Sequence, residues 1–154
     1  MLSNADIWQA AREGDGERLS VLVNSKADLN MKDDNKETPL HLAALWGHTS
    51  ALQILLDGKA TIDIRNHLGA TPLHRAAEGG HSEAVELLVN ANATVNIADY
   101  NDISPLHYVA AAGSSASANV LIKAKASVNV TNCFQESPLH LAARNGDGAT
   151  VQAL

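Results

Sequence analysis

Apolar residues fall in short clusters with the spacing of helical faces, and glycine or proline separates one cluster from the next. The cluster that begins at Pro39 stops before Gly47, a residue type that tolerates the left-handed conformation found at helix ends. A second cluster covers residues 49–57. Its apolar positions on one face are Leu52, Leu55 and Leu56. The pattern predicts two short antiparallel helices joined by a tight turn.

The same pattern recurs every 33 residues along the chain, without insertion or deletion. Threonine or serine before proline favours a helix N-cap with proline at the first helical position. The four copies are Thr38-Pro39-Leu40-His41, Thr71-Pro72-Leu73-His74, Ser104-Pro105-Leu106-His107 and Ser137-Pro138-Leu139-His140. Because one helix pair cannot bury its apolar face alone, we expect the units to stack on one another.

This motif and its period resemble the ankyrin repeat family, whose units combine a β-turn with two antiparallel helices. The resemblance covers essentially the whole chain. It implies an all-α ankyrin-repeat solenoid of stacked helix-turn-helix units joined by β-turn loops. It divides the single domain, residues 1–154, into an N-terminal capping repeat (1–33), full repeats (34–66, 67–99 and 100–132) and a truncated fifth repeat (133–154).

Three parts of the chain depart from the regular unit. The first unit lacks the threonine, proline and histidine, and Arg18 replaces Ala51 of the next unit, as suits a cap with a polar outer face. The fifth unit reaches Leu154 midway through its second helix, so we expect a fragment of a longer repeat protein. Serine and asparagine are frequent in residues 114–122, and we predict that this helix opens first.

Composition narrows the class of protein. The chain has a net charge of −6, which argues against non-specific nucleic-acid binding. It contains neither a membrane-spanning apolar run nor the basic and apolar regions of a signal peptide. Its single cysteine, Cys133, excludes an internal disulfide and a cysteine-based zinc site, and its turn position predicts a surface thiol. We therefore expect an intracellular monomer, cytoplasmic or nuclear, that does not contact membranes.

Seven histidines raise the possibility of metal chemistry. Four of them occupy one repeat position, and equivalent residues of packed helices lie about 10 Å apart. That separation is too large for two of them to share a zinc ion, so we predict that each imidazole bonds its own helix cap and the adjacent turn. The chain also lacks a nucleophile elbow, a phosphate loop and a zinc-protease helix motif. We expect no enzyme activity, metal or cofactor.

The resemblance implies that a partner protein binds a concave surface formed by the turn tips and first helices. Exposed aromatic residues and arginines are the usual anchors of such interfaces. The candidate contact residues are Leu45, Trp46, His67, Leu68, Arg75, Glu78, Tyr100, Tyr108, Phe134 and Arg144. For Tyr108 and Phe134, the alternative that they only cover gaps between units stays open. The function expected is that of an adaptor; alternatives are an inhibitory subunit of an enzyme and a substrate-targeting segment of a larger enzyme.

Two turn positions carry further expectations. One position at the tip of each turn is glycine only in the second turn, as Gly69. The equivalent residues of the other three turns are Lys36, Asp102 and Gln135. Because lysine and glutamine adopt the left-handed conformation at a cost, we expect less regular turns there. Asn30, Asn96 and Asn129 match the turn asparagine of the family, whose side chain bonds the backbone and can be hydroxylated in similar proteins.

Overall fold

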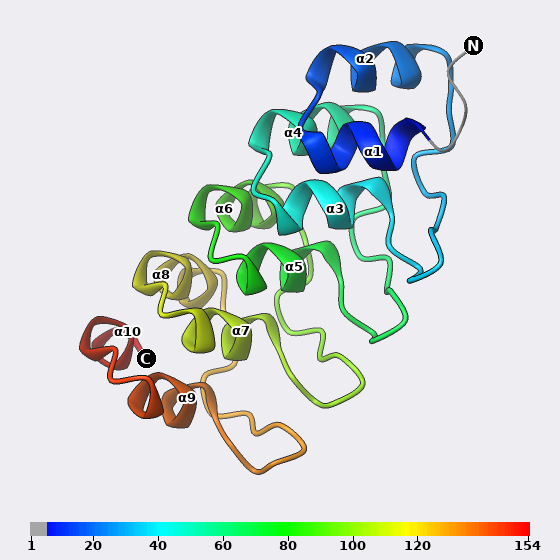
Figure 1. The fold of residues 1–154 in the computed structure, drawn as a ribbon. Coiled ribbons are helices and arrows are strands. Elements are labelled where there is room, and N and C mark those ends of the chain that lie inside the picture. The colour runs from blue at the N-terminus through cyan, green and yellow to red at the C-terminus, as the bar shows by residue number, and fades with distance from the viewer. Residues whose placement is uncertain (1–5) are drawn as a thin grey trace.

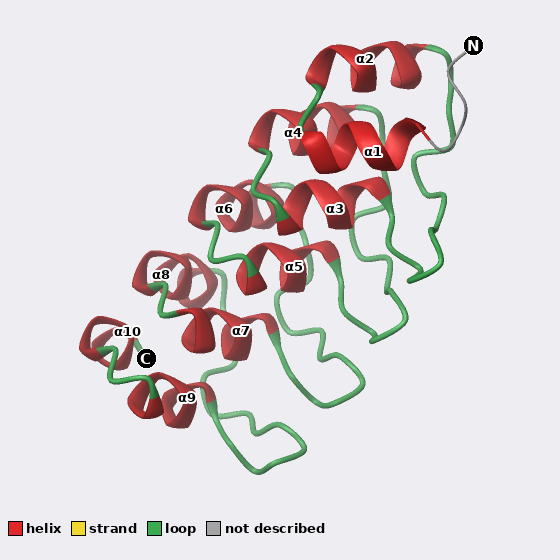
Figure 2. Ribbon diagram, in the orientation of Figure 1, coloured by secondary structure: helices red, strands yellow, loops and turns green. Residues whose placement is uncertain are grey.

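The computed structural model describes residues 6–154, which form a stack of helix pairs with long turns projecting from one side (Figure 1). Helices and loops make up all of the described part, as Figure 2 shows. The helices are α1 (Asp6–Glu13), α2 (Gly16–Asn24), α3 (Pro39–Leu45), α4 (Thr49–Asp57), α5 (Pro72–Glu78), α6 (Ser82–Asn90), α7 (Pro105–Ala112), α8 (Ser115–Lys123), α9 (Pro138–Arg144) and α10 (Gly148–Ala153). The predicted all-α solenoid is confirmed.

Helix boundaries follow the local signals of the repeated motif. Thr38 has an extended backbone conformation, Pro39 begins α3, and the His41 side chain completes a capping box. The equivalent threonine or serine caps α5, α7 and α9 in the same way. Gly47 has φ +69° just after the end of α3, which the left-handed C-terminal position requires. The helices predicted from Pro39 and over residues 49–57 are therefore confirmed.

The core lies between the two layers of helices and consists of leucine, alanine, isoleucine and valine. Leu40, Leu73 and Leu106 are fully buried, or nearly so, where the first helix of one unit meets that of the next. Alanines at the two positions corresponding to Ala43 and Ala44 let neighbouring helices approach closely. No described helix is long and apolar enough to cross a membrane. Residues 1–5, where the absence of a signal peptide was predicted, lie outside the described part of the chain.

The expectation of less regular turns is wrong. Lys36, Asp102 and Gln135 have φ values of 57°, 58° and 61°, so they take the left-handed conformation that Gly69 has at 82°. The residue that begins each turn explains this regularity. In the first of these turns, Asp33 Oδ1 accepts hydrogen bonds from the backbone N–H groups two and four residues later. Asn66, Asp99 and Asn132 do the same in their own turns. These hydrogen bonds stabilise the left-handed conformation at the tip and offset its energetic cost for a residue with a side chain.

Candidate partner-binding surface

The histidines of the repeated motif are part of the scaffold, as predicted. His41 Nδ1 accepts a hydrogen bond from the Thr38 backbone N–H at 3.1 Å, which leaves the proton on Nε2. His41 Nε2 then donates to the Ala70 carbonyl of the next turn at 3.1 Å. His74 and His107 make the equivalent bonds to the carbonyls of Ile103 and Glu136. Burial lowers the pKa of His74 to about 4, which keeps the bridging imidazole neutral.

Two other histidines join consecutive units in a way that sequence reasoning missed. The rings of His48 and His81 lie against Gly14 and Gly47 of the preceding unit, where a Cβ atom would approach within 2.7 and 2.6 Å. Their Nε2 atoms donate to the carbonyls of Arg12 and Leu45, at 3.0 Å each. The only signal in the sequence is a glycine that lies 34 residues before each histidine, that is, one repeat and one residue earlier. Both residues lie at the N-caps of α4 and α6, and from there they hold neighbouring units together.

The row of turn asparagines also connects units. Asn30 Oδ1 accepts from the Thr61 backbone N–H, and Asn96 Oδ1 accepts from the Ser127 N–H, each at 2.8 Å. The predicted side-chain bonding to the backbone is therefore confirmed for these two residues, but it reaches the following unit. The asparagine side chains therefore join consecutive units of the stack.

Four large apolar side chains remain exposed on the predicted contact surface. Trp46 lies at the end of α3 and is 55% exposed. The other three lie on successive turns and are Leu68, Tyr100 and Phe134, with 40%, 67% and 72% of their surface exposed. Leu45 is half-buried beside Trp46, while His67 and Glu78 are exposed. Cys133 is an exposed thiol, as predicted.

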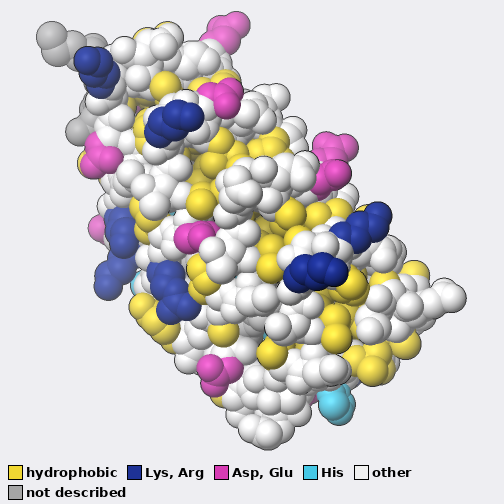
Figure 3. Space-filling model, turned by 180° about the vertical axis from the view of Figure 1, so that it is seen from behind, with side chains coloured by type: hydrophobic (Ala, Val, Ile, Leu, Met, Phe, Trp, Pro, Cys, Tyr) yellow, Lys and Arg dark blue, Asp and Glu magenta, His cyan; other side chains and the backbone are white. Residues whose placement is uncertain are grey.

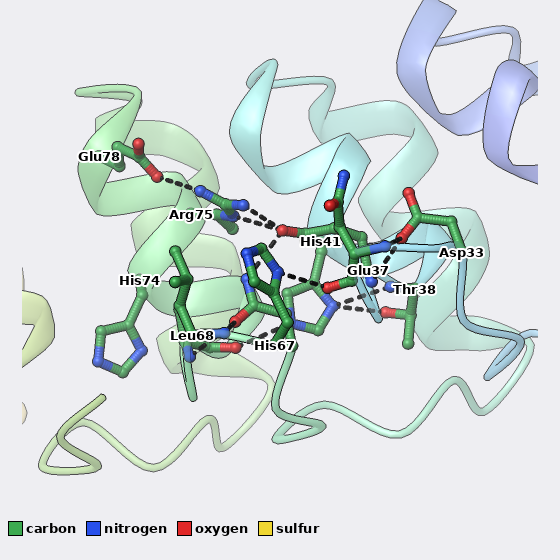
Figure 4. A network of polar contacts seen from close by, with 12 residues as sticks. Asp33, Glu37, Thr38, His41, His67, Leu68, His74, Arg75 and Glu78 are labelled. Carbon is green, nitrogen blue, oxygen red and sulfur yellow. Dashed lines mark hydrogen bonds and ion pairs between the residues drawn. The ribbon is translucent and has the colours of Figure 1, made fainter. Parts of the chain in front are cut away.

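Arg75, in contrast, is held by carboxylates of the protein itself (Figure 4). Its Nε and Nη2 atoms both bond Oε1 of the buried Glu37, and Nη1 lies 2.6 Å from Glu78 Oε2. Asn66 Nδ2 donates to the same Glu37 oxygen at 2.8 Å. This network ties the turn before α3 to α5. The guanidinium is therefore occupied within the scaffold.

Tyr108 is also engaged inside the stack. Its hydroxyl donates to Asp99 Oδ2 at 3.0 Å, and its ring meets His74 edge-on with 5.8 Å between ring centroids. The side chain thus fills the gap between α5 and α7, which was the alternative left open for it. Arg144 is 63% exposed over its side chain and pairs with Glu136 at 2.6 Å.

Figure 3 shows the side of the molecule that faces away from the viewer in Figure 1. Hydrophobic side chains there are interspersed with lysine, arginine, aspartate and glutamate, as Figure 3 shows. A groove between α4 and α6 is lined by residues of both kinds: Gln53, Leu56, Asp57, Glu83, Glu86 and Leu87. Among the described residues, no group of three or more histidine, cysteine, aspartate or glutamate side chains could hold a metal ion.

The amino-acid sequence matches two protein-family models, both for ankyrin repeats. The family model for ankyrin repeats (3 copies) matches residues 7–99, and the model for ankyrin repeats (many copies) matches residues 106–154. No curated protein matches the chain. Together the two family models cover nearly all of the described residues.

Proposed function

Because the chain belongs to the ankyrin repeat family, we propose that it binds a partner protein across its turn tips and the ends of its first helices. Ankyrin repeats generally mediate protein–protein interactions and are typically non-catalytic. The observation that carries the proposal is the exposure of Trp46, Leu68, Tyr100 and Phe134 on this one surface. Large aromatic side chains at the surface are frequent anchors of interfaces.

The bonds that Arg75 and Tyr108 form within the protein reduce the set of residues expected to contact the partner directly. Leu45, His67, Glu78 and Arg144 flank the exposed aromatic residues and can reach a partner. Arg75 and Tyr108 act indirectly, because both hold the scaffold beneath that surface. We expect their substitution to change stability more than it changes contacts with the partner.

A capture experiment with three forms of the protein tests this proposal. The wild type, Trp46→Ala and Val21→Ala would be immobilised and exposed to extract of the source cells. Val21 is a matched control, because it is 54% exposed on α2, away from the turns. We expect a protein retained by the wild type and by Val21→Ala but depleted about tenfold on Trp46→Ala.

Circular dichroism of the three forms would establish that each remains folded. Phe134→Ala is then tested in the same way. If folded Trp46→Ala and folded Phe134→Ala both retain every captured protein as well as the wild type does, the proposed surface is overturned. The identity of the partner then separates two of the roles: an adaptor would retain a non-catalytic protein, and an inhibitory subunit would retain an enzyme.

A further inference from the structure

Gly69 is the only glycine among the four equivalent turn tips. All four tips have positive φ, yet lysine, aspartate and glutamine occupy this conformation at the other three. The backbone conformation alone therefore does not require glycine at position 69. Some other contact of the second turn must exclude a side chain there.

The ring of Tyr100 occupies the space that a side chain at position 69 would need. A Cβ atom on Gly69 would lie 2.8 Å from Tyr100 Cδ1 and 2.9 Å from Cγ, well inside contact distance. The Tyr100 backbone N–H also donates to the Leu68 carbonyl at 3.0 Å. The glycine thus allows the aromatic ring of one turn to lie directly against the preceding turn.

Arg65 holds the same ring from another direction. Its guanidinium carbon lies 5.7 Å from the centroid of the Tyr100 ring, a cation–π distance. The guanidinium is itself fixed, because Nη2 donates to the Ala98 carbonyl. Tyr100 is nevertheless 67% exposed. An aromatic ring that is both restrained and exposed loses little conformational entropy when a partner covers it.

The charges around Tyr100 indicate the chemistry of the partner. Lys32 and Arg65 are adjacent, since Lys32 Nζ contacts the Arg65 carbonyl at 3.5 Å. Neither they nor Lys36 forms an ion pair with any described carboxylate. On the turns that contain Lys36, Gly69 and Tyr100, the exposed carboxylates are Asp34 and Asp102. Asp33 and Asp99 accept hydrogen bonds from the backbone of their own turns. Arg65 is itself exposed, so it presents an unpaired positive charge directly beside the Tyr100 ring.

We propose that Tyr100, held between Gly69 and Arg65, is the principal anchor for the partner and receives a segment with a carboxylate beside an apolar side chain. The carboxylate pairs with Arg65, and the apolar side chain covers Tyr100 and the exposed Leu68. This inference rests on the proposed function, because it names the kind of protein segment that the same surface binds.

A random library of 12-residue peptides, displayed on phage and selected on the wild-type protein, tests this inference. We expect enriched peptides to combine aspartate or glutamate with a neighbouring leucine, isoleucine or phenylalanine. Fluorescence anisotropy of the enriched peptides should show about tenfold weaker binding to Tyr100→Ala and to Arg65→Gln, and unchanged binding to Val21→Ala. Tyr100→Phe, which keeps the ring, should restore binding, and Gly69→Ala should weaken it because the new methyl group displaces the ring.

The outcomes separate this inference from the proposed function. Peptides that lose affinity for folded Trp46→Ala, but not for Tyr100→Ala or Arg65→Gln, would overturn Tyr100 as the anchor and leave the proposed surface intact. Enrichment of basic peptides would overturn the chemistry assigned to the partner segment. If selection on the wild type enriches no peptide beyond selection on the Tyr100→Ala/Trp46→Ala double variant, both the anchor and the surface fail.

Discussion

The stacking face between α3 and α5 and the outward face of α9 contain almost the same residues in different surroundings. Leu40 and His41 in α3 are fully buried, whereas Leu139 of α9 is 46% exposed and His140 is exposed. His140 Nδ1 still accepts a bond from the Ser137 backbone N–H, so the local cap persists. Its Nε2 has no carbonyl partner among the described residues. The comparison shows that the cap is local, whereas burial and the second imidazole bond depend on a neighbouring unit.

The largest expected difference between the two faces concerns their leucines. Leu73→Ala removes a side chain that is 1% exposed, and we expect a loss of about 2–5 kcal/mol in the free energy of unfolding. Leu139→Ala changes the same repeat position where the side chain is half exposed, and should cost less than about 1 kcal/mol. Urea denaturation followed by circular dichroism gives both values. Equal losses would contradict the assigned difference in packing.

The buried histidines predict a dependence of stability on pH. The pKa of His74 is lowered from 6.5 to about 4 by burial, and burial also lowers the pKa values of His41 and His107. Between pH 6.5 and 4 the unfolded chain therefore binds more protons than the folded chain, so stability falls as pH falls through this window. For His74 alone the loss is about 3 kcal/mol.

Denaturation midpoints measured from pH 7 to pH 4 check this expectation. His74→Gln is the matched variant, because glutamine can serve in a capping box but does not titrate. Its stability should decline less over the window than that of the wild type, and NMR titration should place the His74 pKa well below 6.5. A wild-type decline identical to that of His74→Gln would remove this histidine as its cause.

A smaller contrast is expected between α6 and α8. Ser117 is fully buried in α8 at a position where the two preceding units have Ala51 and Ala84. Its hydroxyl accepts a bond from Ser114, but serine remains a poorer helix former than alanine. Amide hydrogen exchange should show α8 opening with a free energy about 1–2 kcal/mol below that of α6. Equal protection of the two helices would contradict the prediction of a weak fourth unit.

The smallest expected effect concerns the turn that carries Gly69. Gly69→Ala should destabilise the protein by about 1 kcal/mol, because the methyl group collides with the Tyr100 ring. In a Tyr100→Ala background the same change should cost less, since other residue types occupy this conformation at the equivalent tips. A double-mutant cycle measured by thermal unfolding gives the coupling between the two residues. If the effects of the two substitutions are additive, the backbone conformation and not the Tyr100 ring requires glycine at position 69.

The sequence by itself determined the repeating unit, the helix boundaries and the scaffold role of the histidines in the motif. These features depend on interactions within a few residues: proline fixes its own φ, the Thr38 N-cap needs only the following turn of helix, and Gly47 tolerates left-handed backbone by itself. Repetition at a constant period then multiplied each local signal. For that reason the all-α solenoid could be predicted without any long-range contact.

The tertiary structure alone decided which candidate side chains are free to meet a partner. Arg75 looked like an anchor because its partner Glu37 lies 38 residues away and meets it only after stacking, and the contact of Tyr108 with the His74 ring of the preceding unit arises in the same way. The contact of Tyr100 with Gly69 arises in the same way, from the angle and distance between neighbouring units. Local chemistry sets each unit, whereas exposure and pairing depend on how one unit sits against the next.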